Sequence, residues 1–224
     1  QCRYDDINDP AREYIRSHPI AHVCASRVGG IPGTDWWNIK SASGGQLMEQ
    51  TIHQMDMLRY LLGREPETVY SVATRGLITQ EDSPGYFTDD LSTTLITFEG
   101  GLTCTMMTGC YSKNGASWDS KMTFGSLDSR MDYVLCSNIA LYGVDPRDSA
   151  ATVAGTIAGD GTQRKSENEV GVTYKSSVDF GTLCDRTFID AVLTGDASHI
   201  RSPYADAYRS TAFTLACNRS METG

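Results

Sequence analysis

The sequence has 224 residues, 40% of them hydrophobic and 21% charged, which is enough for a sizeable core and argues against disorder. Its 19 Lys and Arg residues are outnumbered by 28 Asp and Glu residues, giving a formal net charge of -9. This acidic balance disfavours nonspecific nucleic-acid binding and binding to anionic membrane surfaces, since both need a basic surface.

Other features narrow the class of protein further. No stretch reaches the ~18 consecutive apolar residues of a membrane span, and the charged N-terminal stretch has no apolar signal-peptide core. Seven cysteines without a C-x-x-C pair are typical of reduced thiols in the cytoplasm, so we expect a cytoplasmic protein. We expect no metal site, because the histidines lack metal-ligand spacing: His18, His22, His53 and His199.

The first part of the chain combines a short helix, a strand and a loop. Residues 9–17 are predicted to form a helix capped by Asp9. Residues 20–28 alternate between polar and apolar side chains and predict a strand. The following Gly- and Pro-rich loop carries Trp36 and Trp37.

The best-defined helix is predicted over residues 43–62. Ser43 and Gln46 have the spacing of a capping box, in which each side chain satisfies a free backbone N–H of the other. Gly63 is a natural C-terminal stop.

The rest of the chain predicts a run of strands followed by two helices. Glu99-Gly100-Gly101 has the composition of a hairpin turn, and the stretch 145–169 predicts a long loop or a weak hairpin. Helices are predicted over 180–193 and over 203–221, the second capped by Ser202. Strands are predicted over 68–78, 91–98, 102–111, 121–124, 130–135, 139–142 and 170–175. This order indicates an α+β domain with a mostly antiparallel open sheet and helices on one face.

The helix 43–62 also carries the one pattern with clear chemistry. On a regular helix, Glu49, His53 and Asp56 stack in a column opposite the apolar arc. A histidine between two carboxylates suits proton transfer, because its pKa lies near ~6.5 and a carboxylate stabilises its charged form. The same pattern also fits an ordinary solvated helix face, which periodicity alone favours.

This segment resembles the motif of the glucose–fructose oxidoreductase, inositol dehydrogenase and rhizopine-catabolism (Gfo/Idh/MocA) family. In that family a Gly-Gly turn opens a helix that bears an acid, then a His four residues on, then an Asp three residues further. Here these positions are Gly44-Gly45, Glu49, His53 and Asp56, with Glu49 where the family more often has Asp. The stretch 32–37 and the C-terminal stretch also resemble the family.

The resemblance implies a GAPDH-like C-terminal domain over residues 1–224, which binds substrate and dimerises. It implies that His53 takes a proton from a sugar, polyol or related hydroxyl compound, and that Glu49 orients His53 or binds substrate. Lys40, Trp37 and Tyr111 could bind substrate from loops or strand ends, and Asp56 is assigned equally to substrate binding or to a structural role.

The resemblance also implies NAD or NADP as cofactor, bound mainly by an N-terminal Rossmann domain that is absent from this chain. The sequence has no G-x-G-x-x-G turn and no Glu-Lys-Pro motif. We therefore expect the fragment alone to be inactive, and we expect a homodimer or tetramer through the sheet face. Two alternatives remain open: a non-catalytic binding or dimerisation module of the same fold, and an NAD-dependent glycosidase.

Overall fold

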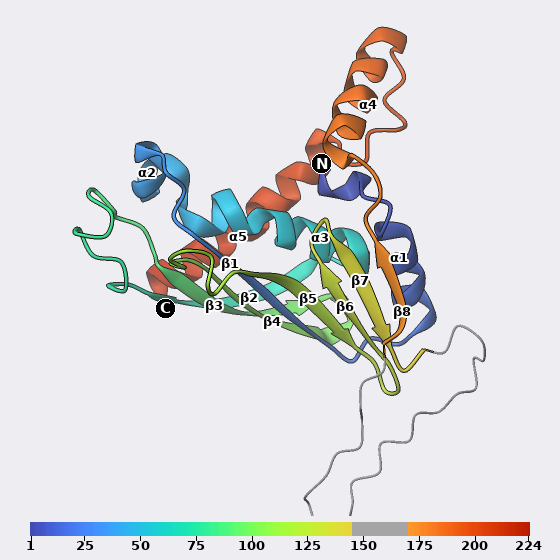
Figure 1. The fold of residues 1–224 in the computed structure, drawn as a ribbon, viewed down its shortest axis with the longest axis horizontal. Coiled ribbons are helices and arrows are strands. Elements are labelled where there is room, and N and C mark those ends of the chain that lie inside the picture. The colour runs from blue at the N-terminus through green and yellow to red at the C-terminus, as the bar shows by residue number, and fades with distance from the viewer. Residues whose placement is uncertain (145–169) are drawn as a thin grey trace, which may run out of the picture.

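The computed structural model describes residues 1–144 and 170–224, and there it shows an open sheet with helices on one face (Figure 1). Eight strands within this part of the chain lie in the order β2-β3-β4-β1-β5-β6-β7-β8. The predicted α+β architecture is confirmed. The loop or hairpin predicted over 145–169 lies outside the described residues.

The sheet is antiparallel except at one pair of neighbours. β1 and β4 run parallel, with Val23 opposite Cys104, whereas every other neighbouring pair is antiparallel. The predicted strands are all present, although the one predicted over 68–78 ends at Thr74. The strands are β1 (His22–Gly29), β2 (Pro66–Thr74), β3 (Leu91–Phe98), β4 (Leu102–Cys110), β5 (Asp119–Gly125), β6 (Arg130–Val134), β7 (Asn138–Tyr142) and β8 (Val170–Lys175).

The helices cover one face of the sheet, apart from α4, which projects away from it (Figure 1). None of the helices in the described ranges is both long and apolar enough to cross a membrane. The α-helices are α1 (Asn8–Ser17), α2 (Lys40–Ser43), α3 (Ile52–Leu62), α4 (Phe180–Thr194) and α5 (Tyr204–Thr223). A 3-10 turn, η1 (Cys2–Tyr4), precedes α1, and a second one, η2 (Asp35–Asn38), precedes α2.

Three predicted helix caps are wrong. α1 begins at Asn8, so Asp9 lies inside its first turn, and α5 has Pro203 rather than Ser202 at its N-cap. Ser43 does not open a long helix but ends α2, because Gly44 takes a left-handed φ of 78° there. Tertiary contacts replace the expected capping box: the Gln46 amide donates to Ser92 Oγ at 3.0 Å.

The core forms between α3, α5 and the covered face of the sheet. Alternate residues of β3 and β4 point toward the helices, among them Ile96, Phe98 and Met106, which are buried. Phe98 meets Phe213 of α5 edge-to-face, with ring centroids 6.1 Å apart. Burial of each large apolar side chain contributes about 1.5–3 kcal/mol, so this layer holds α3 against the sheet.

We predict that Gly44→Ala destabilises the domain more than Gly63→Ala. Both glycines have left-handed backbone, which costs an alanine about 1–2 kcal/mol. A Cβ on Gly44 would also lie 2.7 Å from the Met48 side chain, whereas one on Gly63 meets nothing within 4 Å. Overpacking of this kind typically adds about 1–3 kcal/mol. Urea unfolding of both variants measures the difference, and equal free energies of unfolding would contradict the close contact.

Candidate active site

The helix that carries the chemical motif begins with a π-helical turn. The turn η3 (Leu47–Thr51) runs directly into α3. A π-turn is wider than an α-turn, because its backbone hydrogen bonds join residues i and i+5. It rotates Glu49 relative to His53 and Asp56, so the column expected of a regular helix breaks up. Within the described residues, each of the three bonds to a different partner.

Glu49 is fixed by a chain of side-chain hydrogen bonds. Its Oε2 accepts from Trp37 Nε1 at 2.7 Å and from Gln50 Nε2 at 2.5 Å. Gln50 Oε1 in turn accepts from Arg27 Nη2, at the end of β1, at 2.8 Å. Because Trp37 is fully buried, the Glu49 carboxylate is anchored to the body of the domain.

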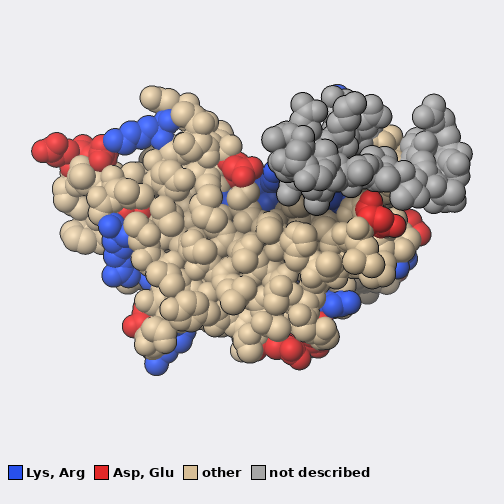
Figure 2. Space-filling model, turned by 90° about the horizontal axis from the view of Figure 1, so that it is seen from below, with Lys and Arg blue, Asp and Glu red and all other residues tan. Residues whose placement is uncertain are grey.

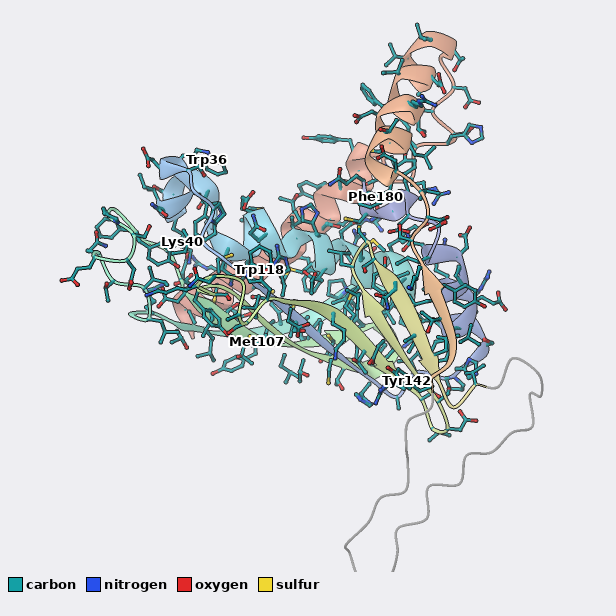
Figure 3. The ribbon with its side chains drawn as sticks, in the orientation of Figure 1. Trp36, Lys40, Met107, Trp118, Tyr142 and Phe180 are labelled. Atoms are coloured by element: carbon teal, nitrogen blue, oxygen red, sulfur yellow. The ribbon has the colours of Figure 1, made fainter. Side chains whose placement is uncertain are left out.

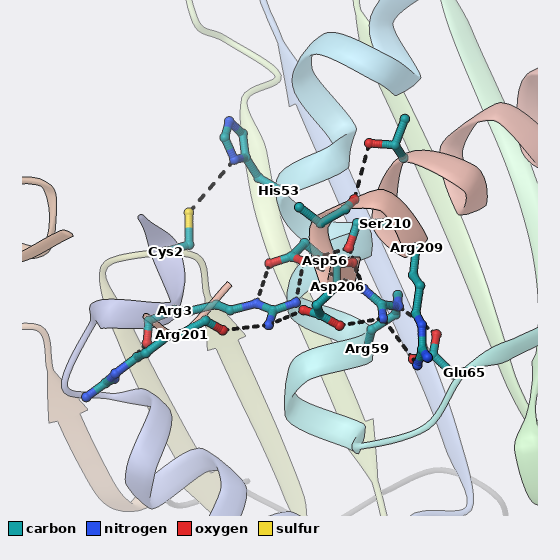
Figure 4. Close-up of polar contacts among 12 residues, drawn as sticks. Cys2, Arg3, His53, Asp56, Arg59, Glu65, Arg201, Asp206, Arg209 and Ser210 are labelled. Carbon is teal, nitrogen blue, oxygen red and sulfur yellow. Dashed lines mark hydrogen bonds and ion pairs between the residues drawn. The ribbon is translucent and has the colours of Figure 1, made fainter. Parts of the chain in front are cut away.

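His53 is exposed and faces a cysteine. Its Nδ1 lies 4.0 Å from the Sγ of Cys2 in η1, a long contact (Figure 4). The Cys2 contact raises the pKa of His53, although partial desolvation and the charge of Arg27 oppose the rise. Cys136 lowers the pKa of the Cys2 thiol by hydrogen bonding, and His53 lowers it further. The contact between the two side chains therefore stabilises the charged form of each, the protonated imidazole and the thiolate.

Asp56 is held in an ion-pair network that joins η1, α3 and α5 (Figure 4). Its two carboxylate oxygens accept from Arg3 Nε at 2.8 Å and from Arg3 Nη2 at 2.6 Å. Ser210 of α5 donates to the same carboxylate at 2.6 Å. These are the contacts of a structural residue, because the protein itself already supplies donors to both oxygens.

The same network continues through Arg59, one turn further along α3. Arg59 pairs with Glu65 through its Nε at 2.7 Å and with Asp206 of α5 through its Nη2 at 2.8 Å. Arg59 lowers the pKa of Glu65 by hydrogen bonding and by its charge. Asp206 also pairs with Arg3, so the two arginines share one acceptor. The first residues of the chain are thereby joined to the helix that bears His53.

In the part of the chain that the structure describes, the partners of Lys40 and Tyr111 do not include His53. Lys40, which is labelled below Trp36 in Figure 3, pairs with Asp89 at 2.9 Å and with Glu222 at 3.5 Å. Tyr111 packs against a small second core that contains Trp37, Ile78, Tyr86 and Cys110. The structure therefore brings Tyr111 and Trp37 together, and connects Trp37 to Glu49.

Three residues of the site have no strong signal in the sequence. Arg27 and Cys2 lie 23 residues or more from their partners Gln50 and His53, so no short spacing reveals them. Gln50 adjoins Glu49, yet nothing distinguishes it from the other polar residues of a helix. The one hint in the sequence is Arg27, a charged residue near the end of the strand predicted over 20–28.

The Gly44-Gly45 turn does not fit a cofactor phosphate. A Cβ on Gly45 would lie 3.2 Å from Thr88 Oγ1 and 3.5 Å from Lys40, so the protein itself fills that side. The Gly44 carbonyl accepts from Asn218 of α5 at 2.8 Å. A dinucleotide needs a glycine turn open to its pyrophosphate. Across the described ranges, no cluster of His, Cys, Asp or Glu is arranged to hold a metal ion.

Comparison with known proteins finds one matching family model and a set of structures with a similar fold. Residues 19–127 match the family model of the GFO/IDH/MocA C-terminal domain. No curated protein sequence matches the chain.

Solved structures share the fold at low sequence identity. UDP-N-acetylglucosamine 3-dehydrogenase GnnA from Acidithiobacillus ferrooxidans has a TM-score of 0.64 at 16% identity, over 95% of this chain and 59% of that one. Aldose-aldose oxidoreductase from Caulobacter crescentus, complexed with glycerol, has a TM-score of 0.66 at 16% identity, over 99% and 60%. Levoglucosan dehydrogenase, in complex with NADH and levoglucosan, has a TM-score of 0.67 at 18% identity, over 95% and 60%. This chain thus spans about 60% of the length of the structures it matches.

We predict that His53 titrates above its ordinary pKa and that Cys2→Ala lowers its midpoint. The alanine removes the sulfur that stabilises the imidazolium, so the neutral ring should form at lower pH than in the unsubstituted chain. NMR titration of the histidine side chains measures both midpoints, with exposed His22 at the start of β1 as the internal control. An unchanged His53 midpoint in Cys2→Ala would show that the sulfur does not affect the ring.

Proposed function

We propose, from the premise that this chain belongs to the GFO/IDH/MocA family as one of its C-terminal domains, that it forms the substrate side of an NAD(P)-dependent oxidoreductase. The proposed substrate is a sugar, a polyol or a related hydroxyl compound. The observation that carries this proposal is the exposed His53 one helical turn after the anchored carboxylate of Glu49. The names of the similar structures support the substrate class, since each acts on or binds a carbohydrate or polyol.

His53 is the proposed proton carrier of the reaction. Its Nδ1 faces Cys2, which leaves Nε2 to take the proton of the substrate hydroxyl. A bound nicotinamide cofactor would supply the hydride acceptor for the carbon that bears this hydroxyl. The contact with Cys2 holds the ring orientation and stabilises the imidazolium that forms when the proton arrives.

Glu49 is proposed to bind substrate rather than to orient His53. Its Oε2 is occupied by Trp37 and Gln50, and this anchoring holds Oε1 in a fixed place. A preorganised carboxylate oxygen can accept a hydrogen bond from a second hydroxyl of a polyol. Asp56 is proposed as a structural residue. Trp37 acts through Glu49, and Lys40 and Tyr111 remain candidates for the outer wall of the substrate site.

The cofactor is proposed to bind mainly to a separate dinucleotide-binding domain of the whole protein. The glycine turn of this chain is filled by its own side chains, and the chain spans about 60% of similar structures. The 224-residue domain alone should neither bind a nicotinamide cofactor tightly nor oxidise a sugar. Holding two reactants in near-attack geometry is worth about 7–11 kcal/mol, and one side of a cleft does not supply it.

We predict that His53→Ala in the full-length enzyme lowers kcat by about 10²–10⁴-fold, the usual contribution of general acid–base catalysis. Glu49→Gln should mainly raise KM, because it weakens a substrate contact and retains the proton carrier. Steady-state kinetics of both variants measure these effects, and His22→Ala is the matched control. If the His53→Ala variant turns over at the wild-type rate, His53 is not the proton carrier. Glu49, His53 and Asp56 would then be ordinary polar residues of a helix surface.

The sheet face away from the helices is the proposed dimer surface. It carries Tyr70, Val72 and Leu95, which are 58%, 52% and 48% exposed, and Met107 on the neighbouring strand (Figure 3). Threonines fill most positions between them on β3 and β4, and charged side chains lie mainly around the rim of this face (Figure 2). An uncharged, partly apolar surface of this kind favours burial against a second copy.

We predict that Leu95→Asp weakens self-association of the domain, since it places a charge at the centre of the proposed interface. Light scattering at micromolar concentration should give a dimer or tetramer for the unsubstituted chain and a monomer for the variant. Leu127→Asp, on the β5–β6 turn and 93% exposed, is the control that should leave the mass unchanged. A strict monomer before substitution would overturn the proposal.

A further inference from the structure

A cavity opens where the C-terminal ends of α1 and α3 meet the start of β4. Its volume is about 450 Å³, which lies within the range of about 300–1,000 Å³ that is usual for ligand pockets. The last turns of both helices line it, together with residues 17–20, which lead into β1, and Leu102 of β4. Leu61 and Leu62 of this lining follow His53 by about 12 Å along the helix axis. The cavity is therefore separate from the candidate active site.

The floor of the cavity is made of aliphatic side chains. Leu61 and Leu102 are buried, whereas Ile15, Ile20 and Leu62 are only partly buried. The three partly buried side chains pack against the main core, and they also line the cavity. A ligand that covers this floor removes apolar surface from water, and each buried methylene tightens binding by about fourfold.

Three arginines surround this aliphatic floor. Arg12 and Arg16 belong to α1, and Arg64 follows the end of α3. The Arg12 guanidinium lies over the Tyr60 ring, 4.8 Å from its centroid, and Arg64 donates to the Glu99 carbonyl at 3.3 Å. Each of these contacts uses only part of the guanidinium group, which carries five N–H donors. Donors therefore remain for a ligand at the mouth of the cavity.

The positive charges are not balanced within the cavity, because no Asp or Glu of the described chain lines it. The cavity beside Lys40 and Arg75 is different, since Asp89 lines it as well and pairs with both cations. Arg16 does pair with Glu13, but both side chains are more than two-thirds exposed, and exposed pairs of this kind are weak. In a chain with a formal net charge of -9, a cavity lined by arginines alone favours a negatively charged ligand.

Helix ends alone do not explain the arrangement. Cations are favourable at helix C-termini, and both α1 and α3 end at this cavity. Carbonyls of both ends already accept donors from their own helix, however: Ser17 Oγ donates to the Glu13 carbonyl at 2.7 Å, and the Gly63 N–H donates to the Arg59 carbonyl at 2.9 Å. These carbonyls need no arginine, and charge compensation of a helix does not account for the aliphatic floor.

We propose that this cavity binds an amphipathic organic anion, whose carboxylate or phosphate head contacts the arginines while its apolar body lies on the aliphatic floor. Guanidinium groups bind the oxygens of either head through charge-assisted hydrogen bonds, which are stronger than those to a neutral head. The head lies between Arg64 at the end of α3 and Arg12 and Arg16 of α1, so the ligand joins the two helices. The site includes neither Glu49 nor His53, and the proposal does not rest on the oxidoreductase function.

Calorimetric titration of the full-length protein tests the proposal with octanoate, octyl phosphate, octyl glucoside and inorganic phosphate, each below its micelle concentration where it forms micelles. Octanoate or octyl phosphate should bind, and the tighter of the two identifies the head group. Octyl glucoside lacks the charge and inorganic phosphate lacks the chain, so each should bind at least about tenfold more weakly. Binding should tighten by about fourfold per methylene from hexanoate to octanoate. Methyl NMR should place the chain against Ile15, Ile20 and Leu62.

Arg64→Ala should weaken binding of the octyl anion by about tenfold, the effect of one lost charge-assisted hydrogen bond. Arg186→Ala, which removes an exposed arginine of α4, is the matched control and should leave the affinity unchanged. Thermal unfolding without ligand checks that both variants fold.

Three results would overturn the proposal: no binding of either octyl anion, octyl glucoside binding as tightly as the anions, or full affinity in the double variant Arg12→Ala/Arg64→Ala. These measurements report binding alone. Failure of the proposed oxidoreductase function would be seen separately, in the kinetics of His53→Ala.

Discussion

The bidentate ion pair between Arg3 and Asp56 is the contact on which the arrangement of the site depends. It fastens the first turn of the chain to the helix that bears His53, and Ser210 and Asp206 attach α5 to the same point. Removal of one partner from a buried pair costs about 3–5 kcal/mol, because the other charge is left uncompensated. Since Cys2 is adjacent to Arg3, the same pair determines that a sulfur lies beside His53.

The site is supported by two separate apolar clusters. The large core holds α3 against the sheet through residues such as Met55 and Leu58, and so sets the position of His53. The small cluster around Trp37 and Tyr86 holds the indole that anchors Glu49. The π-turn lies between Gly44-Gly45 and α3, and after it Glu49 bonds to the Trp37 indole while His53 contacts Cys2. A regular α-helix would point both side chains in a similar direction.

The sequence predicts the fold well because the sheet is built from local alternation. The pattern in β3 and β4 reports directly which side chains are buried, and Gly63 and Gly100 mark a helix end and a turn through their backbone preference. The helix caps failed where tertiary contacts override local ones, as when Gln46 bonds to Ser92 of β3 instead of to Ser43. The motif that resembles the family identifies Glu49, His53 and Asp56 as candidate site residues. It does not show which side chains each of them contacts. Cys2, Arg3 and Arg27 reach α3 from other segments, so only the folded chain reveals them.

The parallel pairing of β1 with β4 has a consequence for how the domain folds. β2, β3 and β4 form one set of hairpins and β5, β6 and β7 form another, and each set can pair between near neighbours in the chain. β1 lies between the two sets and bonds to both. Val23 must therefore pair with Cys104 and Phe124, which are far from it in the sequence. Bringing two distant segments of the unfolded chain together costs conformational entropy before any contact compensates for it. Nonlocal pairing of this kind slows folding. Insertion of β1 is therefore the expected late step, and until it occurs both hairpin sets expose a strand edge that can pair with another chain.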